Sequence, residues 1–272
     1  MIRRPACAKI NLALVVGSVR ADGKHEVATV YQRVALSDRL SIEPARRLAV
    51  RGFPGDTLVR AALAALAEAA GVEPRWLARI QKRLPVAAGL GGGSSDAATA
   101  LRLANETLER PLPTADLERV AARLGSDAPF FLRAGPQLGS GDGAELEPLD
   151  LPQDYWVALV LPYDAAKVST GAVYGDFDRR HGEEGYDERR RALRDALSGI
   201  RRPRDLAALP PNDLASSPLA GELRDLGAFR ADVTGAGPAV YGLFLHRAPA
   251  EAALRALGPR GRVWLTAPAW YV

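Results

Sequence analysis

A glycine-rich segment at residues 84–98 constrains this chain more than any other feature of its sequence. It reads Leu-Pro-Val-Ala-Ala-Gly-Leu-Gly-Gly-Gly-Ser-Ser-Asp-Ala-Ala, and a helical pattern follows it directly. Glycines let a backbone bend sharply and come close to a ligand. A helix N-terminus behind them offers unpaired N–H groups and the positive end of the helix dipole. The segment therefore predicts an anion cradle, and a polyphosphate is the anion that it favours.

The segment matches neither of the two common nucleotide-binding loops. A Walker loop ends in Gly-Lys-Ser/Thr, whereas these glycines run into Ser94, Ser95 and Asp96 without a lysine. A dinucleotide loop needs a preceding strand, which residues 77–84 could supply, and a ribose-binding acid about 20 residues further on. We find no second βαβ unit to accompany it. A plain surface turn is the alternative, but Pro85 before the glycines and the alanine-rich helix behind them argue against a linker.

Length and composition predict a globular protein with one large domain or two ordinary ones. The 272 residues are 47% hydrophobic and 25% charged, and no apolar run approaches the roughly 18 residues that span a bilayer. The basic start leads into Lys9 and Asn11 rather than an apolar signal core. Cys7 is the only cysteine, which excludes an internal disulfide and a cysteine-built metal site. We therefore expect a cytoplasmic protein that has no membrane partner.

The basic charge of the chain favours an anionic partner, either nucleic acid or a small molecule. The net charge is +4 and the pI is about 9.4. The densest basic cluster, Arg189–Arg191, lies among acids and predicts a solvated helix face. An RNA-binding module is one alternative, but such modules interleave aromatic with basic residues, and this chain is only 6% aromatic. We therefore expect a small-molecule partner and no nucleic acid.

The order of predicted elements indicates an α+β fold. Strands are expected at residues 8–16, 27–35, 39–42, 77–84, 155–161 and 262–266, and on both sides of a glycine turn within 232–245. Polar breaks are expected at residues 21–24 and at Ser37-Asp38. Helices are expected at residues 56–70, 94–105, 114–124, 187–197, 217–227 and 248–257. Because no regular βαβα rhythm appears, a doubly wound sheet is disfavoured. Two prolines around residues 149–152 predict an N-terminal lobe over residues 1–150 and a C-terminal lobe over 151–272.

Three further segments carry polar residues that folding alone does not require. Lys9 and Asn11 alternate with apolar residues, so both point off one face of a strand, where Lys9 could neutralise phosphate charge. An edge-strand lysine is the alternative for Lys9. Asp127 lies between the end of a predicted helix and a proline. It could accept a proton from a substrate hydroxyl group, or it could only cap a turn or a helix. The turn Thr234–Gly237 could approach phosphates or could be a simple hairpin.

Taken together, these segments resemble the superfamily that is named for galactokinase, homoserine kinase, mevalonate kinase and phosphomevalonate kinase, the GHMP kinases. The superfamily has three motifs, and the chain carries all three in order, at Lys9–Leu12, Pro85–Ala98 and Thr234–Val240. Within it, the chain is similar to the diphosphocytidyl-methylerythritol kinase family along almost its whole length. The segments that carry this similarity are Ala8–Leu12, Arg20–Glu26, Gly91–Ala98, Leu124–Leu132, Val168–Tyr174 and Asn212–Leu214.

The resemblance implies a two-lobed α+β kinase fold with a central cleft, a ribosomal-protein-like N-terminal lobe that binds ATP and a ferredoxin-like C-terminal lobe. It implies ATP and Mg²⁺ as cofactors, and phosphorylation of the 2-hydroxyl group of diphosphocytidyl methylerythritol in non-mevalonate isoprenoid synthesis. Homoserine kinase and mevalonate kinase activities are the alternatives within the superfamily. The sequence gives no indication of the oligomeric state.

Carried over residue by residue, the resemblance implies a role for each motif. Asp127 would be the base on the acceptor hydroxyl, and Lys9 would favour its charged form and steady the transferring phosphoryl group. Asn11 would help to place the substrate, His25 would read the edge of the cytosine, and Tyr174 would stack on its ring. The glycine segment would bind the triphosphate, with Ser95 also a candidate magnesium ligand. The residues concerned are Pro85, Ala87, Ala88, Gly89, Leu90, Gly91, Gly92, Gly93, Ser94 and Ser95.

Three positions depart from the pattern of the family. Lys24 stands where the family usually has a tyrosine that sandwiches the cytosine. It could lie over the ring or reach the diphosphate, or another aromatic residue could take over the stacking. Thr57 replaces an asparagine that is frequent near the adenine pocket, and Thr234-Gly-Ala-Gly237 replaces a motif that usually reads Ser-Gly-Ser-Gly. These departures affect the substrate assignment more than the kinase assignment.

Overall fold

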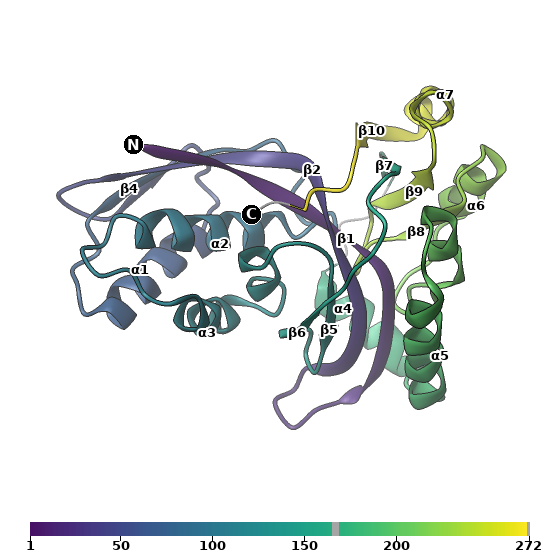
Figure 1. The fold of residues 1–272 in the computed structure, drawn as a ribbon, viewed down its shortest axis with the longest axis horizontal. Coiled ribbons are helices and arrows are strands. Elements are labelled where there is room, and N and C mark those ends of the chain that lie inside the picture. The colour runs from purple at the N-terminus through teal and green to yellow at the C-terminus, as the bar shows by residue number, and fades with distance from the viewer. Residues whose placement is uncertain (165–168, 271–272) are drawn as a thin grey trace.

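Two β-sheets organise the chain (Figure 1). The computed structural model describes residues 1–164 and 169–270, which leaves Val168 of the expected Val168–Tyr174 motif outside the described residues. The first sheet contains β1 (Ile2–Val19), β2 (His25–Pro44), β3 (Ala49–Arg51), β4 (Trp76–Gln81), β5 (Gln137–Ser140) and β6 (Glu145–Pro148). The second has the order β10-β7-β9-β8, from β7 (Trp156–Pro162), β8 (Arg230–Val233), β9 (Val240–Phe244) and β10 (Gly261–Thr266). The α+β class is confirmed.

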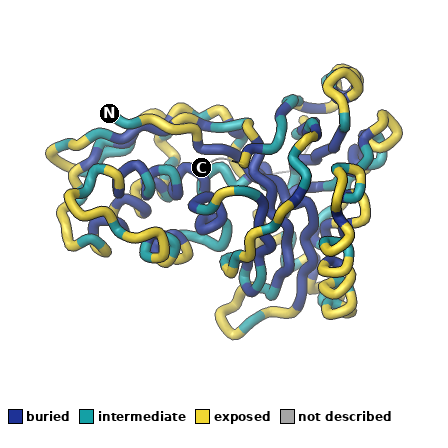
Figure 2. The backbone as a smooth tube through the Cα atoms, in the orientation of Figure 1, coloured by how far each residue is buried: buried dark blue, intermediate teal, exposed yellow. Residues whose placement is uncertain are grey.

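Strands β1 and β2 form a long antiparallel hairpin whose central part is buried on both faces (Figure 2). Helix α2 (Gly92–Asn105) packs on one part of it, and residues of the second sheet and of α5 (Tyr186–Gly199) pack on another. The register places Lys9 opposite Arg33 and Asn11 opposite Tyr31. Charged and polar side chains of this hairpin are therefore held inside the molecule.

The expected break at Ser37-Asp38 is wrong, because β2 continues through both residues to Pro44. A register shift between Cys7 and Ala8 on β1 lets the pairing continue past this point. Asp38 is fully buried and accepts hydrogen bonds from the Lys82 ammonium and from the backbone N–H groups of Arg83 and Leu84. These hydrogen bonds from residues 82–84 compensate for the cost of burying a carboxylate inside the strand.

Three helices cover one face of the first sheet (Figure 1). They are α1 (Leu58–Ala70), α2 and α3 (Thr114–Leu124), each close to its expected range. Their apolar faces and a short 3₁₀ helix at Pro129–Leu132 share one core cluster. The 3₁₀ helix begins two residues after Asp127, so a buried element anchors the segment that carries this acid.

The C-terminal half contains α4 (Thr170–Arg179), α5, α6 (Pro218–Asp225) and α7 (Arg247–Leu257), with 3₁₀ helices at Pro203–Ala208 and Gly258–Arg260. Helix α4 is not among the predicted elements, whereas the other three helices lie close to their predicted ranges.

The predicted solvated face is wrong for Arg189, whose guanidinium pairs with Asp213 at 3.0 Å. Beyond β10, residues 267–270 return to β2, where Ala269 N donates to Arg33 O. The lobe boundary at residue 150 stays a prediction.

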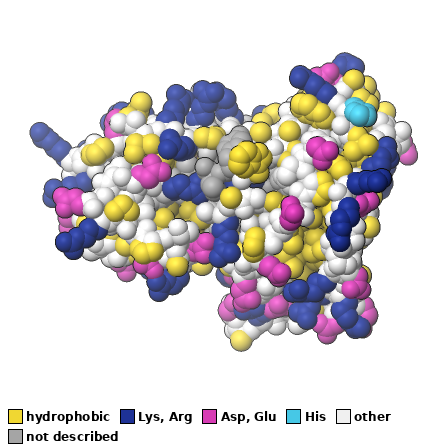
Figure 3. All heavy atoms as spheres, in the orientation of Figure 1, with side chains coloured by type: hydrophobic (Ala, Val, Ile, Leu, Met, Phe, Trp, Pro, Cys, Tyr) yellow, Lys and Arg dark blue, Asp and Glu magenta, His cyan; other side chains and the backbone are white. Residues whose placement is uncertain are grey.

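Lysine and arginine side chains are spread over the visible face among acidic ones, rather than gathered in one patch (Figure 3). Within residues 1–164 and 169–270, no helix is long and apolar enough to cross a membrane. A cleft lies between the glycine segment, the β1–β2 hairpin and α4.

Candidate active site

The cleft has a volume of about 1170 Å³ and brings together residues from distant parts of the chain. Its lining includes Lys9, Asn11, His25, Asp127 and Tyr174, as expected from the sequence. All the predicted residues of the glycine segment from Pro85 to Ser94 line it as well. Ser95 does not, because its side chain lies in the interior of the protein and the residue is 1% exposed.

An ion pair between Lys9 and Asp127 lies in the cleft. Lys9 Nζ is 3.3 Å from Asp127 Oδ2 and donates a hydrogen bond to Asn11 Oδ1 at 2.6 Å. Lys9 is 4% exposed, whereas the Asp127 side chain is 31% exposed. A buried ammonium requires such partners, since an isolated charge in the interior is costly. The carboxylate keeps access to the cleft, where a reacting hydroxyl group could reach it.

Tyr31 completes the surroundings of Asp127, and sequence reasoning missed it. The Tyr31 hydroxyl donates to Asp127 Oδ1 at 3.1 Å, and Lys9 Nζ lies 5.6 Å from the centroid of the Tyr31 ring. Burial raises the pKa of Tyr31 well above its ordinary value, so the hydroxyl stays protonated and acts as a donor. Only the strand register, which pairs Asn11 with Tyr31, could have indicated that Tyr31 lies near Lys9.

The glycine segment forms a tight loop that leads into the N-terminus of α2. Gly89 and Gly91 have positive φ angles of +79° and +66°, and α2 begins at Gly92. A Cβ atom on Gly91 would come within 2.9 Å of Lys9 Cγ, so only glycine lets the loop lie against this lysine. The first turn of a helix has N–H groups without intrahelical partners. These groups lie at the edge of the cleft, at the place where the sequence predicts an anion cradle.

A second charged cluster holds the two ends of the loop together. Lys82 Nζ donates to Asp38 Oδ2 at 2.6 Å and to Asp96 Oδ2 at 2.7 Å. Asp38 lies on β2, Lys82 precedes the loop, and Asp96 belongs to the first turns of α2. Burial raises the pKa of Asp96 to about 7, with Asp38 adding to this effect and Lys82 opposing it. Asp96 Oδ1 is buried without a hydrogen-bond partner.

The other end of the cleft is formed by aromatic and charged side chains. The rings of His25 and Tyr174 lie 4.6 Å apart between centroids, and Asp178 Oδ1 is 2.7 Å from His25 Nε2. Tyr174 and Asp178 both come from α4. Lys24, at the departure from the expected tyrosine, pairs instead with Asp142. No aromatic ring other than Tyr174 lies within 5 Å of the His25 ring among the described residues.

The third motif reaches the same place through its backbone. Thr234 Oγ1 accepts a hydrogen bond from Asn11 N at 3.1 Å and donates to Gly89 O at 3.2 Å. Ala239 N donates to Ala88 O at 3.2 Å. The three motifs that are separate in the sequence therefore meet at one point beside the Lys9–Asp127 pair.

Comparisons with known proteins agree with this geometry. The chain matches the models of the GHMP kinases N terminal domain over residues 57–135 and of the GHMP kinases C terminal domain over residues 206–261. It is similar to proteins named 4-diphosphocytidyl-2-C-methyl-D-erythritol kinase. The protein from Chlorobaculum tepidum is 35% identical over 96% of this chain and 95% of its own length. The protein from Moorella thermoacetica is 38% identical over 88% of each chain.

Solved structures show the same relationship. A crystal structure of 4-(cytidine 5'-diphospho)-2C-methyl-D-erythritol kinase is 31% identical, with a TM-score of 0.79 over 98% of this chain and 99% of that one. A mevalonate kinase has a TM-score of 0.76 over 98% of this chain and 99% of its own, at 13% identity, which indicates a shared fold only. The chain therefore belongs to the 4-diphosphocytidyl-2-C-methyl-D-erythritol kinase family of the GHMP kinases, and it is an ATP-dependent small-molecule kinase.

Proposed function

We propose that this protein transfers the γ-phosphoryl group of ATP to the 2-hydroxyl group of 4-diphosphocytidyl-2-C-methyl-D-erythritol, in the non-mevalonate synthesis of isoprenoid precursors. The observation that carries the proposal is the Lys9–Asp127 pair, which lies beside the glycine loop in the same cleft. The names of the relatives that match most of the chain support the choice of acceptor. Both substrates are polyanions, which agrees with a cleft that contains loop amides and lysines.

The triphosphate would lie on the glycine loop. Loop backbone from Pro85 to Ser94 lines the cleft, and the N-terminus of α2 adds a positive dipole end. Phe53 and Leu58 lie beside this end, since Lys82 Nζ is 5.7 Å from the Phe53 ring and a Cβ on Gly93 would come 2.9 Å from Leu58 Cδ1. These two apolar side chains would contact the nucleoside of ATP.

Asp127 would accept the proton of the acceptor hydroxyl group as its oxygen attacks the γ-phosphorus atom. Lys9 would donate to the phosphoryl oxygens and neutralise their charge in the transition state. Asn11 would act through Lys9, because its Oδ1 accepts from the ammonium and its Nδ2 donates to Thr29 Oγ1 at 2.7 Å. Phosphoryl transfer needs positioning and charge neutralisation rather than covalent help, so these groups suffice.

The diphosphocytidyl group would occupy the end of the cleft that contains α4. His25 would bond to the edge of the cytosine, with its ring orientation fixed by Asp178, and Tyr174 would stack on the base. The Lys24 side chain is 49% exposed at this end, and its ammonium would face the diphosphate. A charged contact of this kind would compensate for the stacking that a tyrosine at this position would supply.

Mg²⁺ would accompany ATP and neutralise phosphate charge. Residues 1–164 and 169–270 contain no cluster of three or more His, Cys, Asp or Glu that could hold a metal. This fits an ion that takes most ligands from phosphates and water. The protein oxygens that fit are the partnerless Asp96 Oδ1 and the hydroxyl of Ser94, which lines the cleft where Ser95 does not.

A cytoplasmic location is part of the same proposal. Cys7, the single cysteine of the chain, is buried and forms no disulfide bond. Such cysteine usage is typical of a reducing compartment.

The proposal is tested by measuring ATP consumption with the diphosphocytidyl substrate, homoserine and mevalonate as alternative acceptors. We expect turnover with the first only. The variant Asp127→Asn should bind ATP with unchanged affinity and lose roughly 10²- to 10⁴-fold in kcat, because the proton acceptor is removed. The matched control is Asp187→Asn on α5, where the side chain is 72% exposed.

Two results would contradict the proposal in different ways. Turnover with homoserine or mevalonate and none with the diphosphocytidyl substrate would refute the choice of acceptor. Full activity of Asp127→Asn would exclude this residue as the base. Equal loss in the Asp187→Asn control would attribute the effect to folding rather than to chemistry.

A further inference from the structure

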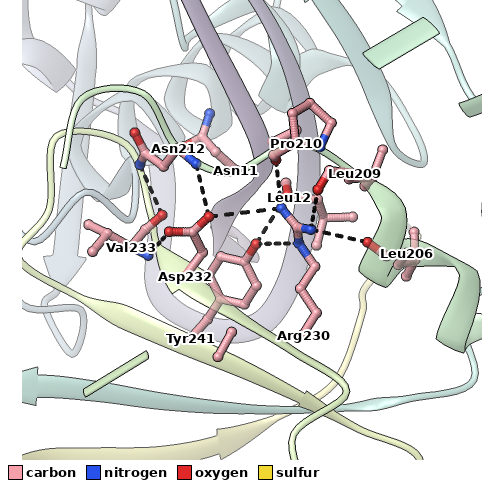
Figure 4. A network of polar contacts seen from close by, with 12 residues as sticks. Asn11, Leu12, Leu206, Leu209, Pro210, Asn212, Arg230, Asp232, Val233 and Tyr241 are labelled. Carbon is pink, nitrogen blue, oxygen red and sulfur yellow. Dashed lines mark hydrogen bonds and ion pairs between the residues drawn. The ribbon is translucent and has the colours of Figure 1, made fainter. Parts of the chain in front are cut away.

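Asn212 is a buried asparagine that uses its whole side chain on backbone groups (Figure 4). Its Nδ2 donates to Val233 O at 3.0 Å and to Gly235 O at 2.7 Å, and its Oδ1 accepts from Leu214 N at 2.8 Å. A side-chain amide is the group that offers two donors and an acceptor in this arrangement. Asn212 therefore fixes the path of the turn that follows β8.

A buried arginine and an aspartate hold Asn212 in turn (Figure 4). Asp232 Oδ2 accepts from Asn212 N at 2.9 Å, and Asp232 lies 3.9 Å from the guanidinium of Arg230. Arg230 is 6% exposed and donates to four oxygen atoms, those of Leu206, Leu209, Pro210 and Tyr241. The Tyr241 hydroxyl donates to Leu12 O on β1 at 3.1 Å. This network lies outside the cleft and links the second sheet to the strand that carries Lys9.

The turn that Asn212 holds lies directly against the reacting groups. A Cβ atom on Gly235 would be 3.4 Å from Lys9 Nζ and 3.5 Å from Asn11 Oδ1. Thr234, the residue before it, accepts from Asn11 N through its hydroxyl oxygen. A displaced turn would therefore change both the space around the ammonium and the strand position of Asn11.

Asp213, the next residue, makes the corresponding contacts on the other side. Its Oδ2 accepts from Val16 N on β1 at 2.9 Å and from Arg189 Nε on α5 at 3.0 Å. Its backbone N donates to Leu14 O at 2.9 Å. Arg189 also donates to Val16 O at 3.1 Å and to Gly182 O at 2.7 Å. The Asp213 side chain is 12% exposed, so water screens these contacts only weakly.

These contacts place the helix that forms the substrate end of the cleft. Arg180, the residue that follows α4, donates to the carbonyl oxygens of Asp213 and Leu214. Gly182, which Arg189 holds, follows two residues later. Helix α4 carries Tyr174, whose ring faces His25. The distance between α4 and β1 therefore depends on Asp213 and its arginine partners.

We propose that Asn212 and Asp213 are positioning residues that set the two walls of the cleft from one point of the chain. Asn212 places the Gly235 turn against Lys9 and so acts on the transfer step. Asp213 places α4 against β1 and so acts on binding of the diphosphocytidyl group. The inference rests on the proposed function, because it assigns the α4 end of the cleft to that group.

Isosteric variants of the full-length protein separate the two roles. Asn212→Asp keeps the shape of the side chain but replaces two donors with an acceptor that faces two carbonyl oxygens. We expect kcat to fall about 100-fold while the KM values for ATP and for the diphosphocytidyl substrate change less than threefold. This result would place the effect on the transfer step.

Asp213→Asn keeps an acceptor for Val16 N but removes the charge that pairs with Arg189. We expect the KM for the diphosphocytidyl substrate to rise about tenfold, with kcat and the KM for ATP within threefold of wild type. Arg189→Gln should reproduce this effect, and the double variant should add little to it, since both changes break one contact. The matched control is Asp225→Asn, an exposed residue of α6, which should behave as wild type.

Thermal unfolding of each variant distinguishes positioning from a purely structural role. If the variants only melt earlier, with kcat and both KM values at wild-type levels below the melting temperature, the proposal is wrong. It is also wrong if Asp213→Asn raises the KM for ATP as much as that for the diphosphocytidyl substrate. A wild-type protein that ignores this substrate refutes the proposed function instead. With the acceptor that the protein does phosphorylate, Asn212→Asp must then lower kcat and Asp213→Asn must raise the KM for that acceptor. If the two variants do not differ in this way, the inference is wrong.

Discussion

The glycine loop and the third motif approach each other closely in the cleft, and this contact leads to a prediction for Gly89→Ala. A Cβ atom at this position would lie 2.1 Å from the carbonyl oxygen of Thr234 and 3.2 Å from that of Gly237. Real Cβ contacts essentially never fall below 3.0 Å, so the Thr234 carbonyl would have to retreat by about 1 Å. Gly89 also has φ = +79°, which an alanine adopts at a cost of roughly 1–2 kcal/mol.

These two effects are separable because Gly71 has only one of them. Gly71 ends α1 with φ = +66°, and nothing lies within 4 Å of the Cβ that an alanine would add. Gly71→Ala should therefore lose roughly 1–2 kcal/mol of unfolding free energy and keep its activity. Gly89→Ala should lose at least as much stability, and in addition about 100-fold in kcat/KM, because the displaced turn touches Lys9. That loss corresponds to about 2.7 kcal/mol of transition-state stabilisation.

Urea unfolding and steady-state kinetics on the two variants provide the test. Both should show lower unfolding free energies than wild type, and only Gly89→Ala should lose activity at temperatures where it is fully folded. If Gly89→Ala keeps kcat/KM within threefold of Gly71→Ala, the close contact between the two glycine turns has no part in catalysis.

Two further predictions concern titrating and hydroxyl groups of the cleft. Burial raises the pKa of Asp96 to about 7 from its ordinary 3.8, so the folded protein holds this proton more tightly than the unfolded chain does. The stability that comes from the protonated Asp96 is complete below pH 4 and is lost as the pH rises through 7. Asp96→Asn cannot ionise and should therefore show a smaller fall in unfolding free energy between pH 5 and pH 8; parallel pH profiles in urea melts would contradict this. Tyr31→Phe should lower kcat about tenfold, because Asp127 loses a hydrogen bond that orients it. Tyr155→Phe, which removes a buried hydroxyl without a partner, should leave kcat unchanged, and an equal loss in both variants would refute the role of Tyr31.

The features that the sequence predicted are those with local causes. The glycine loop and α2 follow from residues within one segment, and Lys9 and Asn11 share a face because alternate residues of a strand do so. The Lys9–Asp127 pair is different, since the two residues lie far apart in the sequence and no periodicity joins them. Only resemblance to a known family brought them together before the structure did.

Helix α4 shows why another part of the site escaped prediction. Two of its ten residues, Gly171 and Gly175, are glycines, which lower helix propensity, and only Phe177 is buried. The helix is stabilised instead by Ser169, whose side chain caps Ala172 N, and by contacts of Tyr174 and Asp178 with His25. Those contacts come from the other end of the chain, and sequence patterns cannot contain them.

Asp38 illustrates the opposite error, in which a local signal was present and tertiary contacts overrode it. Ser37-Asp38 has the composition of a turn, and turns favour both residue types. In the structure Asp38 is the acceptor for Lys82 and for two loop amides, and this role requires it to lie inside β2. The residue with the composition of a turn is thus part of the support of the glycine loop.

Hydrogen-bond capacity explains why Lys9 fits the chemistry of transfer and Lys82, another lysine of the cleft, does not. An ammonium group has three donors. Lys82 directs two of them to carboxylates at 2.6 and 2.7 Å, and its charge is balanced by two acids, Asp38 and Asp96. Lys9 makes one short bond, to Asn11, and its single acid lies farther away at 3.3 Å. Lys9 is therefore the ammonium that can turn toward a transferring phosphoryl group, whereas the two short bonds of Lys82 hold the ends of the glycine loop together.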